Sequence, residues 1–174
     1  MLDLIQSWIS WDKKASSFIF RHNSYPSLNF AMQVLTHGGD FLGQLVIIPL
    51  FWFWGLPILP YITIQFFVQV IIFFLKLSIG RKRPFVQNPG LAHIGRTPWN
   101  MSFPSGHTAA ATISFLYPLF FKLPFPAVFL FFWLMIVVGF TRMYLRVHYL
   151  TDVIAGFLLG IGLFACWVSF LLIS

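Results

Sequence analysis

Residues 142–173 read RMYLRVHYLTDVIAGFLLGIGLFACWVSFLLI. A short polar cluster leads here into a mostly apolar run of about 20 residues, the length of an α-helix that crosses the hydrocarbon core of a bilayer. Cations and histidines are costly inside that core, so we expect the cluster to lie at the membrane surface where the helix begins. This stretch predicts a helical membrane protein that carries polar chemistry at the end of a span.

The composition of the whole chain agrees with this prediction. Of its 174 residues, 59% are hydrophobic and only 9% are charged, against roughly 25% charged residues in a soluble domain. Besides the helix expected at about 149–173, apolar runs predict helices at about 57–79, 105–121 and 125–143. The sequence therefore predicts an all-α integral membrane protein in one domain, 1–174, with about six transmembrane helices.

The N-terminal third is harder to divide into spans. Residues 2–20 mix apolar with charged side chains, which is typical of an amphipathic helix lying in the membrane interface, and they lack the pattern of a secretory signal. Residues 28–56 are apolar except for a polar break, His-Gly-Gly-Asp, at 37–40. They form either one long kinked helix or a short helix followed by a true span that begins near Phe41.

Three polar clusters stand at the ends of the predicted helices. They are Lys76 with Arg83 and Pro84; Pro104, Ser105, Gly106 and His107; and Arg142 with His148 and Asp152. Because consecutive spans run antiparallel, the helix ending near 79, the helix beginning near 105 and the turn near 145 meet the same membrane surface. The sequence thus predicts a single polar site assembled from distant clusters.

The balance of charges excludes one class of function. The net charge of +7 arises from 11 Lys and Arg against only four Asp and Glu. A protein that binds nucleic acid would spread its cations over a solvated face, whereas these cations stand beside apolar helices. We therefore predict no nucleic-acid partner; the expected partner of these helices is the lipid bilayer.

The two histidines of the clusters differ in their neighbours along the chain. Asp152 follows His148 by four positions, so both side chains share one face at the start of a helix. A carboxylate that holds one ring N–H leaves the other nitrogen free to attack, which predicts that His148 is a nucleophile. His107 has no acid near it in sequence, and it is the candidate for protonating a leaving group and then activating water.

The remaining residues of the clusters suit a phosphoryl group. Lys76, Arg83 and Arg142 would supply fixed positive charge to its oxygens. Ser105 and the amide of Gly106 stand at the N-terminus of a helix, where unpaired donors favour an anion.

Each feature also has a simpler explanation when it is taken alone. The PSGH tetrapeptide can be a turn with a helix cap, and a histidine near a membrane surface can be an interfacial or packing residue, as we expect for His22, His37 and His93. Basic residues beside helix ends commonly anchor or orient the helix. We expect that role for Lys13, Lys14, Arg21 and Lys122. The placement of three clusters on one surface favours the catalytic interpretation.

The clusters resemble the signatures of the type 2 phosphatidic acid phosphatase superfamily, K-x6-R-P, PSGH and S-R-x5-H-x3-D. The match covers about residues 76–152, and Thr141 stands where the family usually has Ser, which keeps the hydroxyl. The resemblance implies a metal-independent phosphatase without a cofactor, with a phosphohistidine intermediate and a bundle of six spans. It also implies a bacterial inner-membrane protein whose active site faces the periplasm or the outer side, and inhibition by vanadate.

A simple count of positive charges would instead place the clustered surface in the cytoplasm. The cations of the clusters are required by the phosphate, however, so they do not report orientation. Only the four anchor cations are free to do so, and an even number of spans puts most of them in the cytoplasm.

The lipid substrate is less well determined. Small bacterial members of the family act on lipid A at its 1-phosphate, on undecaprenyl diphosphate or on phosphatidylglycerol phosphate, and we favour the first. Arg81, Lys82 and Arg96 add positive charge beside the clusters and are candidate selectivity residues for a second phosphate, although attraction to anionic lipid explains them equally well. An alternative of another class is a lipid carrier or scramblase that lacks catalysis. The sequence leaves the oligomeric state open.

Overall fold

The computed structural model describes residues 10–17, 25–88, 90, 92–98 and 101–173. These residues form helices and no strands, which confirms the predicted all-α class. The elements, in chain order, are α2 (Pro26–Leu35), the 3₁₀-helix η1 (Thr36–Gly39), α3 (Phe41–Phe53), α4 (Ile58–Ile79), α5 (Pro84–Gln87), α6 (Gly106–Phe120), α7 (Phe125–Tyr144) and α8 (Leu150–Ile173). Residues 10–17 form one more short helix ahead of α2.

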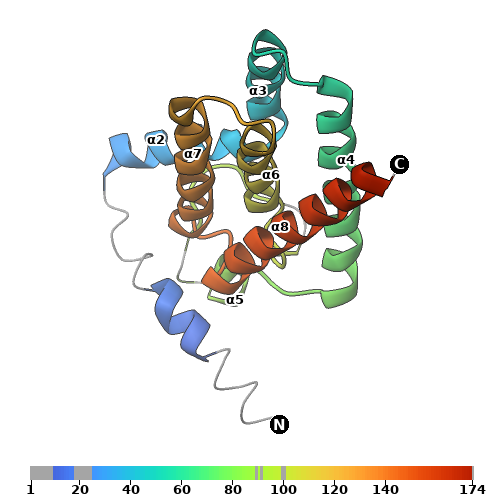
Figure 1. Ribbon diagram of the computed structural model, residues 1–174. Helices are drawn as coiled ribbons and strands as arrows, with labels where there is room; N and C mark the ends of the chain where they lie inside the picture. The colour runs from blue at the N-terminus through green and yellow to red at the C-terminus, as the bar shows by residue number, and fades with distance from the viewer. Residues whose placement is uncertain (1–9, 18–24, 89, 91, 99–100, 174) are drawn as a thin grey trace.

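Helix α6 lies at the centre of the bundle, between α4, α7 and α8 (Figure 1). Its residues 109–111 are three buried alanines, so neighbouring helices can approach closely. On α8, a Cβ added to Gly156 would lie 2.6 Å from the carbonyl oxygen of Ser105, and one added to Gly160 would lie 2.7 Å from Cβ of Thr112. The GxxxG spacing of α8 therefore packs that helix against α6.

Three helical segments are long and apolar enough to cross a membrane, namely Ile58–Gln87, Phe125–Tyr144 and Leu150–Leu171. A fourth span results if the bent pair Pro26–Gly39 and Phe41–Phe53 is counted as one. The described residues thus offer three or four candidate spans, fewer than the six expected. The difference arises because α6 has only 15 residues, most of them buried within the bundle, and because α2 and α3 are each short.

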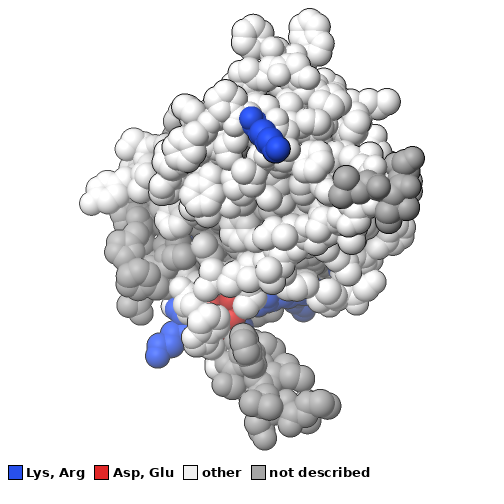
Figure 2. All heavy atoms as spheres, viewed as in Figure 1, with Lys and Arg blue, Asp and Glu red and all other residues white. Residues whose placement is uncertain are grey.

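The exterior of the bundle matches a membrane protein. Large apolar side chains are exposed along α4, α7 and α8, among them Phe66, Phe67, Phe74, Leu77, Phe125, Leu130, Leu158 and Phe170. Figure 2 shows a face that is almost free of charge, apart from one isolated cation. The other charged atoms in that view gather at its lower edge, where Figure 1 places α5 and the beginning of α8.

The polar break at residues 37–40 bends the chain. Helices α2 and α3 meet there at 59°, as either a broken span or a re-entrant loop. Asp40 caps α3, because its side chain accepts hydrogen bonds from the amides of Leu42 and Gly43. The structure has a short helix followed by a second helix from Phe41, but this second helix has only 13 residues and is not a separate span. The two helices reach the length of a span only when they are counted together, which is closer to the interpretation of 28–56 as one kinked helix.

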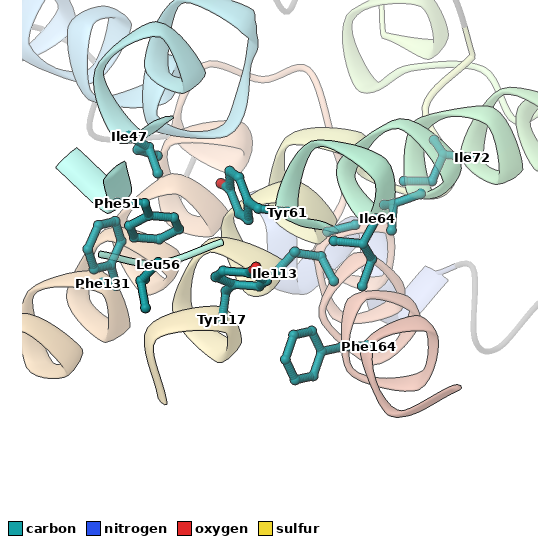
Figure 3. Close-up of a cluster of buried hydrophobic side chains, with 12 residues drawn as sticks. Ile47, Phe51, Leu56, Tyr61, Ile64, Ile72, Ile113, Tyr117, Phe131 and Phe164 are labelled. Carbon is teal, nitrogen blue, oxygen red and sulfur yellow. The ribbon is translucent and has the colours of Figure 1, made fainter. Parts of the chain in front are cut away.

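The bundle has one large apolar core. It consists mainly of aromatic and branched side chains from α3, α4, α6, α7 and α8 (Figure 3). Tyr61 and Tyr117 stand among them with their rings 5.0 Å apart. The hydroxyl of Tyr61 is hydrogen-bonded to Gln44 and Ser114, so a polar group in this apolar interior is satisfied within the protein.

Candidate active site

The three polar clusters meet at one end of the bundle, as the topology of the sequence predicts. The amide of Ser105, at the start of α6, donates to the carbonyl oxygen of Asp152 at 3.0 Å. Nη1 of Arg83, between α4 and α5, donates to the carbonyl oxygen of Val147 at 2.7 Å. The first bond joins the cluster of Ser105 to that of Asp152, and the second joins Arg83 to the chain beside His148.

His148 lies in the turn between α7 and α8 and is 1% exposed. Its Nδ1 is 3.5 Å from Oδ2 of Asp152, and its Nε2 is 3.3 Å from Nη1 of Arg83. Burial, together with the positive charges of Arg83, Arg142 and Lys76, holds the pKa of His148 well below its ordinary range. The imidazole is therefore neutral at pH 7, with one nitrogen toward a carboxylate and the other toward a guanidinium.

Asp152 is fully buried on the first turn of α8 and is held from two sides. Its Oδ2 accepts from the amide of Tyr149 at 2.9 Å, on the side where His148 lies. Its Oδ1 accepts from Nη1 of Arg81 at 2.7 Å. The carboxylate that faces His148 is thus fixed by a backbone donor and a guanidinium.

The second cluster forms the N-terminus of α6. Ser105 is the N-cap, and its Oγ accepts from the hydroxyl of Thr108 at 2.8 Å. A Cβ on Gly106 would lie 3.1 Å from Oε1 of Gln69, so a larger residue would crowd that side chain. His107 follows with a side chain that is 29% exposed. In this position, His107 can meet a ligand that arrives from outside the bundle.

An acid that sequence analysis missed lies beside His107. Oδ2 of Asp40 is 3.8 Å from Nε2 of His107 and 2.6 Å from Nδ1 of His37. A Cβ on Gly39 would lie 2.5 Å from the carbonyl oxygen of His107, so η1 packs directly against the start of α6. The signal was the scarcity of acids, since Asp40 is one of only four in the chain, and an acid within a membrane protein suggests a function.

The three cations of the predicted phosphate site are buried around this end of the bundle. Lys76, Arg83 and Arg142 are 8%, 3% and 7% exposed. Nη1 of Arg142 donates to the hydroxyl of Thr36 at 2.8 Å, while its buried Nε has no hydrogen-bond partner. Three buried cations with a donor to spare form a site that a multiply charged anion would complete.

The three candidate selectivity residues have different surroundings. Lys82 and Arg96 are exposed. Arg81 instead lies between two carboxylates, with Nη2 at 2.5 Å from Oδ2 of Asp12 and Nη1 on Asp152. This geometry supports a structural role for Arg81 more than contact with a substrate.

Other residues considered in the sequence lie outside the candidate site. The ring of His93 packs against Phe85, and its Nε2 is 2.8 Å from the hydroxyl of Thr97. Lys122 lies in the turn between α6 and α7, at the opposite end of α6 from His107. His22 and Arg21 fall outside the described residues. Within the described part of the chain, no group of three or more His, Cys, Asp or Glu side chains could hold a metal ion.

Comparison with known proteins identifies the family. The family model of the PAP2 superfamily matches residues 54–172. A solved structure of a transmembrane PAP2-type phosphatidylglycerolphosphate phosphatase from Bacillus subtilis is 26% identical, with a TM-score of 0.78, over 94% of this chain and 86% of that one. LpxE from Aquifex aeolicus is 21% identical and has a similar fold, with a TM-score of 0.78 over 90% of this chain and 93% of that one. No curated protein matches the chain significantly. Because the family model spans all three clusters and most of the bundle, the chain belongs to the PAP2 superfamily.

Proposed function

We propose that the protein hydrolyses a phosphate group from a membrane lipid through a phosphohistidine intermediate on His148. One observation carries this proposal: His148 is buried and neutral, with Nδ1 toward Asp152 and Nε2 toward the cation Arg83. A phosphoryl group whose oxygens took over the donors of Arg83 would release Nε2 of His148 and bring phosphorus to it. The exposed apolar flanks of the bundle support a substrate that resides in the bilayer.

In the first step, the lone pair on Nε2 of His148 attacks phosphorus. The bond between phosphorus and the lipid oxygen breaks, and protonated His107 gives its proton to that oxygen, so that the lipid leaves as an alcohol or, from a diphosphate, as a monophosphate. The proton on Nδ1 of His148 stays on the ring, facing Asp152. Burial and the positive charge of Arg142 lower the pKa of His107 to about 4, and Asp40 opposes this shift because its carboxylate lies 3.8 Å from Nε2. Asp40 therefore favours the protonated donor that the first step needs.

In the second step, His107 is neutral and takes a proton from water. The water oxygen attacks phosphorus, the bond between phosphorus and Nε2 breaks, and its electron pair returns to His148. Inorganic phosphate leaves, with His107 protonated and His148 neutral as at the start. Throughout, Lys76, Arg83 and Arg142 balance the charge on the phosphoryl oxygens, and Ser105 and Gly106 position the start of α6 beside them.

Exposed positive charges outside the group of Lys76, Arg83 and Arg142 support a lipid substrate that carries two phosphate groups. Lipid A 1-phosphate is the lipid favoured by sequence analysis, whereas the Bacillus subtilis neighbour is named for phosphatidylglycerolphosphate. Lipid A, phosphatidylglycerol phosphate and undecaprenyl diphosphate all carry two phosphate groups. The exposed cations Lys82 and Arg96 would attract the phosphate that does not react.

The decisive experiment measures phosphate release from these three lipids by the purified full chain in detergent micelles. We expect turnover of at least one lipid, inhibition by vanadate, and an acid-labile phosphoenzyme after rapid quenching. No phosphate release from any of the three would contradict the proposal. It would favour the alternative of a lipid carrier or scramblase, particularly if vesicles with the protein exchanged lipid between leaflets.

We further infer that catalysis needs no metal ion, because buried Lys76, Arg83 and Arg142 supply the charge that a divalent cation would otherwise provide. Turnover should persist in excess EDTA. Loss of activity on chelation, restored by Mg²⁺, would contradict this inference.

The expected orientation puts the site on the periplasmic or outer side of the bacterial membrane. A Lys82→Cys variant tests it in a Cys166→Ser background, because Cys166 is the only native cysteine. A thiol reagent that cannot cross the membrane should label Cys at position 82 in spheroplasts without lysis. Labelling only after lysis would place the site in the cytoplasm.

A further inference from the structure

The short helix of residues 10–17 is docked onto the active-site end of the bundle. Trp11, Lys13 and Lys14 on this helix are exposed, but Asp12 and Ser16 are 1% and 0% exposed. Burial of two polar side chains four positions apart means that one face of the helix is committed to a polar contact. An interfacial helix that served only as an anchor would bury apolar residues instead.

The contact is with the first turn of α8. The amide of Leu150 donates to Oγ of Ser16 at 3.1 Å, and the amide of Thr151 donates to Oδ1 of Asp12 at 3.1 Å. The first amides of a helix have no acceptor within the helix itself. Residues 10–17 therefore cap α8 from a distant part of the chain, just ahead of Asp152.

Asp12 also controls the charge around Arg81. Its Oδ2 accepts from Nη2 of Arg81 at 2.5 Å, and Nη1 of the same guanidinium donates to Asp152 at 2.7 Å. The guanidinium carbon lies 4.2 Å from the ring centroid of Tyr149, which holds the group in place. The forked donors of Arg81 thus join two carboxylates, one of them the partner of His148.

A chain of contacts consequently runs from Asp12 through Arg81 and Asp152 to His148. With both carboxylates present, the positive charge of Arg81 is shared, and Asp152 keeps negative charge for the imidazole at 3.5 Å. Without the charge of Asp12, Arg81 would be neutralised by Asp152 alone. Asp152 would then support the Nδ1–H of His148 less well, and Nε2 would be a weaker nucleophile.

We propose that Asp12 is a positioning residue for the nucleophile, acting through Arg81 and Asp152, and that helix 10–17 serves to hold Asp12 against Arg81 and the first turn of α8. This inference rests on the proposed function, in which His148 attacks phosphorus. It assigns Arg81 a role different from that of Lys82 and Arg96, because its donors are occupied by carboxylates of the protein.

The kinetic test compares Asp12→Asn, Asp12→Glu, Ser16→Ala and Lys14→Gln in the full chain, with phosphatidylglycerol phosphate, lipid A and undecaprenyl diphosphate in micelles as substrates. Asp12→Asn keeps an oxygen to accept from the amide of Thr151 but loses the charge and the second oxygen, which accepts from Arg81. It should lower kcat roughly 10- to 100-fold with little change in KM, as for partners that orient a reactive group. Asp12→Glu should recover part of the loss, and Lys14→Gln, on the exposed face, should match the wild type.

Ser16→Ala separates this role from simple stability. It removes one cap from α8 but no charge, so it should lower the midpoint of thermal unfolding while kcat stays within about twofold of the wild type. A wild-type kcat in Asp12→Asn would overturn the proposal. So would a loss of kcat in Ser16→Ala as large as that in Asp12→Asn, because the helix would then act only through stability.

A second measurement needs no substrate and therefore distinguishes failure of this inference from failure of the proposed function. In protein labelled with ¹⁵N-histidine, the ring signals of His148 are assigned by their absence in His148→Gln. Asp12→Asn should shift these signals and leave those of His93 unchanged, whereas Lys14→Gln should shift neither. Unchanged His148 signals in Asp12→Asn would overturn the coupling, even if the wild type turned over no lipid.

Discussion

The two histidines of the site are supported in opposite ways. His148 is buried, and its carboxylate partner Asp152 comes from the same short stretch of chain, four positions later. His107 is 29% exposed, and the carboxylate beside it, Asp40, comes from the bend between α2 and α3. The difference matches the two proposed roles. A nucleophile needs a fixed neutral ring, whereas an acid–base residue must exchange protons with the leaving group and with water.

Removing His148, the proposed nucleophile, should have the largest effect. His148→Ala leaves no nitrogen to form the intermediate, so phosphate release should fall by about 10⁴-fold or more, and no acid-labile phosphoenzyme should form. Steady-state assays and rapid quenching with ³²P-labelled lipid measure both. If the phosphoryl group is found on His107 in the wild type, the two assignments are reversed.

The second histidine should be less essential, and its effect should depend on the leaving group. His107→Ala removes a proton donor worth about 10²- to 10⁴-fold with a lipid alkoxide. With p-nitrophenyl phosphate, whose leaving group needs no proton, formation of the phosphoenzyme should be nearly unimpaired. If the rate of phosphoenzyme formation fell equally on the lipid and on p-nitrophenyl phosphate, His107 would bind the phosphate and would not donate a proton.

The pH dependence of kcat/KM should reflect the lowered pKa of the buried histidine, His148. The pKa of His148 lies below 6.5, so its reactive neutral form persists as the pH falls below the usual histidine range. An unshifted histidine would lose about tenfold of kcat/KM one pH unit below its pKa. We expect a smaller loss at pH 5.5, after correction for ionisation of the lipid phosphate. An acid limb with an apparent pKa of 6.5 or above would contradict the environment described for His148.

Neutralising Asp40, which lies beside His107, should reduce kcat less than removing either histidine. Asp40→Asn keeps the cap on α3, because the amide oxygen still accepts from Leu42, but removes the charge near His107. We expect a fall in kcat of roughly tenfold, as for loss of one charge-assisted contact. His37→Gln is the matched control, because it removes the other imidazole in contact with Oδ2 of Asp40 but keeps the carboxylate charge near His107, so kcat should fall less than in Asp40→Asn. If Asp40→Asn has wild-type activity, Asp40 acts only as a helix cap.

The smallest effect on activity is expected for Lys82 and Arg96, which lie outside the surroundings of both histidines. Lys82→Ala and Arg96→Ala remove exposed cations that would attract a second phosphate in ground and transition states alike. KM should rise a few-fold with kcat unchanged, and the rise should shrink as salt increases. If kcat fell on lipids with one phosphate as well as on lipids with two, Lys82 and Arg96 would act in catalysis together with Lys76, Arg83 and Arg142.

The environment of His148 was largely predictable because it depends on local geometry. Residues four apart on a helix share a face whatever surrounds them, so the pairing with Asp152 follows from the spacing alone. The antiparallel order of the helices likewise predicted that Arg83, Ser105 and His148 would meet.

The environment of His107 was not predictable from the spacing of residues. Hydrophobic length, helix periodicity and the order of the spans were enough to predict an all-helical membrane protein, one end of the bundle where the motifs converge, and the pairing of His148 with Asp152. The packed bundle was needed to show that α6 is a short central helix and that Asp40 lies beside His107. It was also needed to show that Asp12 contacts Arg81 and α8. Those contacts join segments far apart in the chain, and they depend on the bend between α2 and α3 and on the docking of residues 10–17, which no local pattern specifies.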